Sequence, residues 1–165
     1  ESLTLSLAFT KIGPDGAQQL ATLRQAPSLR HFALDLHGSA LKDNGVASLA
    51  LISHAPRLLR LSLDLKANDV SDDGAQGLAA AFRCGPQQLQ MLELDFGHNF
   101  LTDAGAQALA GLCQMKGLKE LHLHLGHNEI SSEAMQELRG CEEAPAVYSL
   151  RADGQRNLAQ GTTDP

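Results

Sequence analysis

Residues 118–130 read LKELHLHLGHNEI, in which leucines alternate with polar residues and an asparagine follows. Residues 58–70, LLRLSLDLKANDV, and residues 89–101, LQMLELDFGHNFL, carry the same pattern in the same phase. Alternation with a period of two is typical of a β-strand with one buried face. Because the pattern recurs along the chain, it predicts a fold made of repeating units.

The chain carries five copies of this unit. Each copy starts with an apolar triplet, and the triplets are Leu3-Leu5-Leu7, Phe32-Leu34-Leu36, Leu61-Leu63-Leu65, Leu92-Leu94-Phe96 and Leu121-Leu123-Leu125. Small residues follow the triplets at spacings of 29, 29, 31 and 29 residues, at Gly16, Gly45, Gly74, Gly105 and Ala134. We expect them to let each helix approach the next repeat closely, since one copy alone cannot bury both its strand and its helix.

A polar turn follows each predicted strand. Asn68, Asn99 and Asn128 occupy the turns of the last three copies. A buried asparagine amide at this position can hydrogen-bond to loop backbone groups that have no partner in the sheet. Thr10 and Ser39 take the same place in the first two copies, where a hydroxyl offers fewer hydrogen bonds.

Each turn leads into a predicted helix. Two copies show apolar residues at helical spacing, at Ala75, Leu78, Ala79 and Phe82 and at Ala106, Leu109, Ala110 and Cys113. Ser71, Thr102 and Ser131 stand where N-cap residues are favoured. The unit is therefore predicted to run from strand to turn to helix and back through a return loop.

The motif LxxLxLxLxxN, seen in Leu118-Leu121-Leu123-Leu125-Asn128, resembles the ribonuclease-inhibitor-like leucine-rich repeat. The usual pattern of that subclass is LxxLxLxxN, so this chain resembles an extended variant in which the strand gains one alternation. The resemblance implies an α/β leucine-rich-repeat solenoid of about five repeats. A curved parallel sheet would lie on its concave side and the helices on its convex side.

The repeats are assigned to residues 1–28, 29–57, 58–88, 89–117 and 118–140. Residues 141–153 are predicted to form a degenerate C-terminal cap, in which Val147, Tyr148 and Leu150 make a sixth strand, and residues 154–165 a polar tail. The first strand has no capping element before it. We expect its leucines to be covered either by further repeats upstream or by a partner.

Composition disfavours several classes of function. The formal net charge is −6 and no cluster of Lys or Arg stands out, which argues against nucleic acid as a partner. No apolar run approaches the ~20 residues that cross a bilayer. Cys84, Cys113 and Cys141 form no CxxC pair, so we expect an intracellular, cytoplasmic protein without a disulfide framework. Because no phosphate-binding loop, dinucleotide glycine motif or nucleophile elbow occurs, we predict neither a cofactor nor catalysis.

Polar residues between the strand leucines are predicted to form three columns on the concave face. By alignment, the columns are Ser2, His31, Arg60, Met91 and Glu120; Thr4, Ala33, Ser62, Glu93 and His122; and Ser6, Asp35, Asp64, Asp95 and His124. These side chains alternate with the buried ones, so they point away from the core and are available for binding.

The third column contains three aspartates, Asp35, Asp64 and Asp95, on neighbouring strands ~4.8 Å apart, where like charges repel. One interpretation is an acidic stripe that receives a basic partner. The other is a solvated strand face in which aspartate suits the geometry of the following loop. The sequence leaves both interpretations open.

Histidines and carboxylates meet on the last two strands, at His122, His124, Glu93 and Asp95. Such groups can bind zinc, but the face is open and no HExxH spacing occurs. We therefore predict no metal site and expect these histidines to pair with the carboxylates and to titrate with pH. His98 and His127 share one turn column and are interpreted as loop residues rather than ligands.

The leading hypothesis is a non-catalytic protein–protein interaction module that receives a partner with a basic segment on its concave, acidic strand face. The predicted partner-binding residues are Asp35, Arg60, Asp64, Met91, Glu93, Asp95, Glu120, His122 and His124. An alternative is a structural subunit of a large multi-subunit assembly, docking through its ends or its convex helices. The family resemblance also implies a third role, as a small-GTPase regulator or an enzyme inhibitor.

Overall fold

A computed structural model of the chain describes residues 1–85, 88–139 and 147–151. In these ranges the strands form one parallel sheet of six, in the order of the sequence. The strands are β1 (Ser2–Ser6), β2 (His31–Asp35), β3 (Arg60–Asp64), β4 (Met91–Asp95), β5 (Glu120–His124) and β6 (Val147–Arg151). The predicted sixth strand is present, whereas the rest of the predicted cap and the tail at 154–165 lie outside the described residues.

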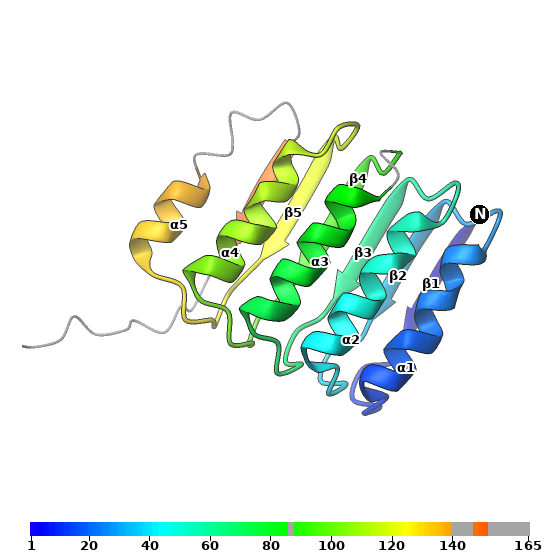
Figure 1. Cartoon of the computed structure of the whole chain (residues 1–165), viewed down its shortest axis with the longest axis horizontal. Coiled ribbons are helices and arrows are strands. Elements are labelled where there is room, and N and C mark those ends of the chain that lie inside the picture. The colour runs from blue at the N-terminus through cyan, green and yellow to red at the C-terminus, as the bar shows by residue number, and fades with distance from the viewer. Residues whose placement is uncertain (86–87, 140–146, 152–165) are drawn as a thin grey trace, which may run out of the picture.

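The helices of the described ranges cover one face of this sheet and leave the other face open (Figure 1). The α-helices are α1 (Gly13–Leu20), α2 (Lys42–Leu49), α3 (Asp72–Cys84), α4 (Asp103–Ala110) and α5 (Ser132–Arg139). Short 3-10 helices follow α1, α2 and α4, at η1 (Ala21–Gln25), η2 (Ala50–His54) and η3 (Gly111–Gln114). The expected α/β solenoid, with its sheet on one side and its helices on the other, is confirmed.

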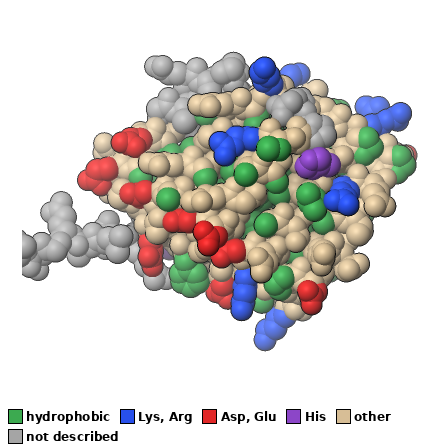
Figure 2. Space-filling view, in the orientation of Figure 1, with side chains coloured by type: hydrophobic (Ala, Val, Ile, Leu, Met, Phe, Trp, Pro, Cys, Tyr) green, Lys and Arg blue, Asp and Glu red, His purple; other side chains and the backbone are tan. Residues whose placement is uncertain are grey.

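The outer surface of the helix layer carries mixed charge. Figure 2, in the orientation of Figure 1, shows Asp and Glu side chains mainly over the left and lower parts of this face. Lys and Arg side chains lie mainly at its upper and lower edges, and apolar side chains reach it as separate small patches. Among the residues drawn in colour, this face therefore offers no broad apolar area for docking.

The additional apolar residue of the extended motif, which follows each strand, adds a layer to the core. Leu36, Leu65 and Phe96 directly follow β2, β3 and β4, and all three are fully buried. Their N–H groups still donate to the next strand, to the carbonyl oxygens of Asp64 (2.9 Å), Asp95 (2.8 Å) and His124 (2.8 Å). Burying a side chain of this size contributes about 1.5–3 kcal/mol, so the longer motif strengthens each repeat.

The predicted helical stripes are buried, and the predicted N-caps are confirmed. The hydroxyls of Ser71, Thr102 and Ser131 accept backbone N–H groups at 3.3, 3.4 and 3.1 Å. One helix is shorter than its spacing suggested, because α4 ends at Ala110. Cys113 is still buried, but it lies in the 3-10 turn η3.

Buried asparagines join each later repeat to the one before it. The Asn99 side-chain oxygen accepts the N–H groups of Asn68 (3.0 Å) and Val70 (3.1 Å) in the preceding turn. Its amide nitrogen donates to the carbonyl of Leu65 at 3.0 Å. Asn68 and Asn128 act in the same way and are fully buried. The predicted role of these residues is therefore confirmed.

A carboxylate at the start of each later helix also holds the following repeat. Asp43 accepts the N–H groups of Ser71 (2.8 Å) and Gly74 (3.1 Å) and the Ser71 hydroxyl (2.9 Å). A Cβ added at Gly74 would lie 2.5 Å from the Asp43 carboxylate, so this approach requires glycine. Gly45, Gly74 and Gly105 thus face the preceding repeat, not the next one as expected. The equivalent carboxylates are Asp72 and Asp103.

Repeat 1 presents part of its apolar layer to solvent. Leu3 is 37% exposed, whereas Phe32, its register partner on β2, is 2% exposed. The hydroxyls of Thr10 and Ser39 donate only to backbone carbonyls, among them that of Leu7 at 2.6 and 2.8 Å. The covering of these leucines by upstream repeats or by a partner stays a prediction. The expected weaker hydrogen bonding of the first two turns is observed.

The three buried asparagines Asn68, Asn99 and Asn128, here called the asparagine ladder, allow a direct test of stability. We expect Asn99→Ala to lower the free energy of unfolding by at least about 3 kcal/mol, because buried N–H and C=O groups lose their partner. Urea denaturation followed by circular dichroism measures this loss. The matched control is Asn44→Ala on the exposed surface of α2, for which we expect a change within about 0.5 kcal/mol. Equal losses in the two variants would contradict the ladder.

Two glycines of α3 form a second matched test. Alanine has the higher helix propensity by about 1 kcal/mol. A Cβ at Gly77 meets only the Ala47 Cβ at 3.5 Å, so Gly77→Ala is expected to stabilise the protein. Gly74→Ala is expected to destabilise it, since the new Cβ would strike the Asp43 carboxylate. Thermal unfolding distinguishes the two, and stabilisation by both would show that the Asp43 contact is unimportant.

Candidate functional site

The side of the sheet that faces away from the helices, here called the sheet face, carries the three polar columns in register. His31, Arg60, Met91 and Glu120 pair along one column. The other two columns pair in register as Ala33, Ser62, Glu93 and His122 and as Asp35, Asp64, Asp95 and His124. β6 extends the last two with Ser149 and Arg151. The alignment expected from the sequence is therefore the observed one.

The three aspartates of the third column, here called the acidic row, also shape the strand ends. Asp35, Asp64 and Asp95 each accept the backbone N–H group two residues further along the chain. The donors are His37 (3.1 Å), Lys66 (3.0 Å) and Gly97 (2.8 Å). The interpretation that aspartate suits the following loop thus has direct structural support. These bonds use one carboxylate oxygen of each residue.

The central carboxylate of the acidic row, Asp64, is the one whose ionised form is disfavoured. The pKa of Asp64 is raised, first because burial disfavours the ionised carboxylate and then because Asp95 and Asp35 repel it from both sides. The Lys66 N–H and the nearby His37 oppose this shift. The ionised form of Asp64 is therefore disfavoured, and a cation placed against this carboxylate would stabilise it.

Ion pairs cross the sheet face beside the acidic row. An Arg60 guanidinium nitrogen lies 3.6 Å from a Glu120 oxygen, so this pair reaches across β4 where Met91 lies between them in register. Glu120 is also 3.9 Å from His122 Nε2. These side chains remain partly exposed, so the pairs are weak and open to exchange with a partner.

Glu93 lies near residues of the middle and third columns. It accepts the Ser62 hydroxyl at 3.0 Å and lies 4.0 Å from His124 Nε2. The expected pairing of histidines with carboxylates is thus present. In the described ranges, no group of three or more His, Cys, Asp or Glu side chains is placed to hold a metal ion.

A hollow of about 420 Å³ lies on the sheet face over β1 to β4. It forms where small side chains, Thr4, Ala33 and Ser62, stand on adjacent strands. Arg60 and Met91 also line it. The hollow is large enough for a partner side chain, and it directly adjoins the acidic row along β2 and β3.

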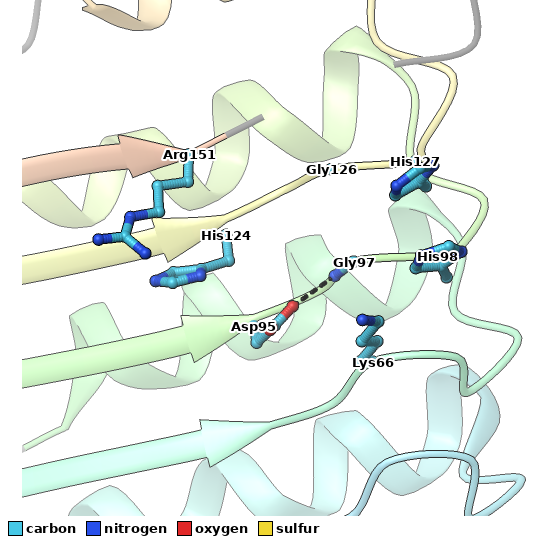
Figure 3. Close-up of a pocket in the computed structure, with 8 residues that line it drawn as sticks. All are labelled: Lys66, Asp95, Gly97, His98, His124, Gly126, His127 and Arg151. Atoms are coloured by element: carbon cyan, nitrogen blue, oxygen red, sulfur yellow. Dashed lines mark hydrogen bonds between the residues drawn. The ribbon is translucent and has the colours of Figure 1, made fainter. Parts of the chain in front are cut away.

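A smaller pocket of about 220 Å³, here called the rim pocket, opens where β3 to β6 end (Figure 3). Its side chains are Lys66, Asp95, His98, His124, His127 and Arg151. The rings of His98 and His127 stack at 3.9 Å with an interplanar angle of 19°. The sequence predicts that these two histidines share one turn column, but it does not predict that they lie close to Lys66 and Arg151.

Parallel strands in sequence order, joined by helices and held by buried asparagines, define a solenoid of strand–helix repeats. The leucine-rich repeat family model matches residues 2–21, 61–79, 89–110 and 121–138. Each match covers a strand and most or all of the helix that follows it. These matches show that the chain contains leucine-rich repeats, and its α/β fold is that of a leucine-rich-repeat solenoid.

Leucine-rich repeat domains generally mediate protein–protein interactions and are typically non-catalytic. The matches do not distinguish between subclasses, so the ribonuclease-inhibitor-like assignment stays a prediction. No curated protein matches the chain. Within the described ranges, none of the helices combines the length and hydrophobicity needed to span a bilayer.

The effect of the ionised Asp64 carboxylate on the stability of the protein can be measured. Asn at position 64 keeps an acceptor for the Lys66 N–H group but carries no charge. Since folding raises the pKa of Asp64, its ionised form costs stability at neutral pH, and this cost disappears below the ordinary value of 3.8. We expect Asp64→Asn to raise the free energy of unfolding at pH 7 by less than about 1 kcal/mol, because the site is half-exposed.

Urea denaturation at pH 7 and pH 3 tests this expectation, and the gain should vanish at the lower pH. Glu137→Gln, which removes an exposed carboxylate from α5, is the control and should not reproduce the full pH dependence. Destabilisation of Asp64→Asn at pH 7 would show that the carboxylates do not repel one another appreciably.

Proposed function

We propose that this protein binds a protein partner on its sheet face and catalyses no reaction. The observation that carries the proposal is the hollow beside the acidic row. The hollow combines apolar and polar surface with room for a side chain, and the neighbouring carboxylates supply directional charge. Interfaces are commonly anchored by a few side chains seated in such depressions.

The polar columns support this proposal because the fold does not bury them. Ser2 and Arg60 are exposed. On β2 to β5, the polar side chains of the columns alternate with buried apolar side chains. Five strands span about 20 Å at ~4.8 Å per strand. A helix or an extended peptide segment of the partner fits this width, whereas a broad domain surface does not.

The acidic row favours a partner segment that carries Lys or Arg. Asp64 stands between two further carboxylates, and its raised pKa reports the repulsion and burial that a cation would offset. Charge complementarity of this kind affects specificity and the rate of association more than raw affinity. Binding is therefore expected to weaken as salt screens the row.

A second candidate function is a structural subunit of a multi-subunit assembly. It is favoured by an apolar hollow of about 430 Å³ at the side of β1, lined by Leu3, Leu5, Leu7, Ile12, Leu20 and Leu23. In this case docking would use the end of the stack instead of the sheet face. We also propose an intracellular, cytoplasmic location, which rests on the absence of a CxxC pair from the sequence; Cys84 is an exposed free thiol.

One substitution at each surface distinguishes the candidates. Ala33→Arg fills the hollow of the sheet face, and we expect it to weaken partner binding at least tenfold, which is about 1.4 kcal/mol. Quantitative pull-down of the native partner from cell extract measures the loss. The control is Ala80→Arg, the same change on the exposed surface of α3, which should leave binding intact.

Circular dichroism should show that both arginine variants are folded. Loss of binding in Ala33→Arg alone supports the sheet face. If Leu3→Glu abolishes binding while Ala33→Arg leaves it unchanged, the sheet-face proposal is wrong and the end of the stack is the docking surface. Retention of the partner by all three variants would contradict both candidates.

A further inference from the structure

The rim pocket is a concentration of nitrogen-bearing side chains in an acidic protein. Arg151 and His124 are register partners at the ends of β6 and β5. Lys66, His98 and His127 lie in the loops that follow β3, β4 and β5, and all five side chains line one pocket (Figure 3). No role in the fold accounts for this convergence, since these side chains belong to the surface and not to the core.

We propose that the rim pocket binds an oxyanion, such as a phosphate, a sulfate or a carboxylate group. Lys66 and Arg151 supply permanent positive charge, and the guanidinium offers paired donors that match two oxygens of such a group. His98, His124 and His127 supply further ring N–H donors. The proposal goes beyond partner binding on the sheet face and does not depend on it.

A bound anion would stabilise the protonated forms of the stacked histidines, His98 and His127, most. Two rings with centroids 3.9 Å apart cannot both be protonated without strong repulsion unless a negative charge is close. The pKa of His98 is lowered, first by desolvation and then by the positive charges of His127, Lys66 and His37, whereas Asp95 raises it. The part of this shift that comes from His127, Lys66 and His37 is a positive charge that a bound anion would offset.

The charge of Asp95 provides the main test, because its removal should increase the affinity for an anion. Asp95 lines the pocket, and its Oδ1 accepts the Gly97 N–H at 2.8 Å. Its negative charge opposes a bound anion. Asp95→Asn keeps an acceptor for Gly97 but removes that charge, so it should tighten anion binding. The same variant should weaken a basic partner on the acidic row, so the two proposals predict opposite effects.

Binding should also depend on pH through the histidines. The groups that face them are Lys66, His37 and Asp95 around His98 and His127, and Glu93, Asp95 and Arg151 around His124. An anion favours the protonated rings, so complex formation takes up protons and affinity rises as the pH falls. Sulfate is the suitable probe, because its own charge stays constant over this range.

The experiment is a sulfate titration of the full chain, followed by NMR of its seven histidine rings at constant ionic strength. Saturable shifts are expected at His98, His124 and His127 but not at His31 or His54. Lys66→Gln and Arg151→Gln should each weaken sulfate about three- to fivefold. The matched control is Arg57→Gln, which removes an exposed charge elsewhere and should have no effect. Asp95→Asn should strengthen binding by a similar factor.

His127→Asn is a further variant that leaves the backbone unstrained, because Asn tolerates the left-handed φ of 59° at this position. It should flatten the pH dependence of sulfate affinity. Phosphate and acetate titrations then distinguish a tetrahedral oxyanion from a carboxylate. Equal shifts at all histidines, weaker binding in Asp95→Asn, or affinity unaffected by Arg151→Gln would each overturn the proposal.

Discussion

The turns of repeats 2, 3 and 4 are each completed by an asparagine amide from the repeat that follows, and the stacking of the repeats depends on these hydrogen bonds. The turn after β3 has left-handed residues at Ala67 (φ 53°) and Asp69 (φ 56°), which interrupt its sheet hydrogen bonds. Asn99 replaces the missing partners by accepting two N–H groups and donating to carbonyls. An asparagine side chain supplies both functions in one planar group, which serine and threonine do only in part.

The asparagine hydrogen bonds join turns whose strands pair in register, and this register aligns the columns of the sheet face. Asp35, Asp64 and Asp95 are register partners on neighbouring strands. Their two interpretations are compatible, because one oxygen of each carboxylate holds the loop while its charge still faces outward. The pKa of Asp64 is raised by burial and by repulsion from Asp95 and Asp35, and a basic partner would offset both effects.

The period of the sequence was sufficient to predict the strands, the helices, the asparagine ladder and the membership of the three columns. It was not sufficient for features that depend on contacts between repeats. Asp43 reads as an ordinary acidic residue at a helix start, yet it holds the cap of the next helix. His98 and His127 were visible as a turn column, but their stacking follows from left-handed loops and close repeat spacing that no local pattern encodes.

The repeats are not held together equally, and this bears on binding. The three interfaces that join repeats 2 to 5 each combine an asparagine with a carboxylate, whereas repeat 1 joins repeat 2 through Ser39, the sheet and apolar packing. In a linear array, the repeat with the weakest interface opens first. The hollow of the sheet face extends from β1 to β4. A partner seated there would contact repeat 1 and its neighbours together, and its binding free energy would therefore also stabilise the least secured end of the stack.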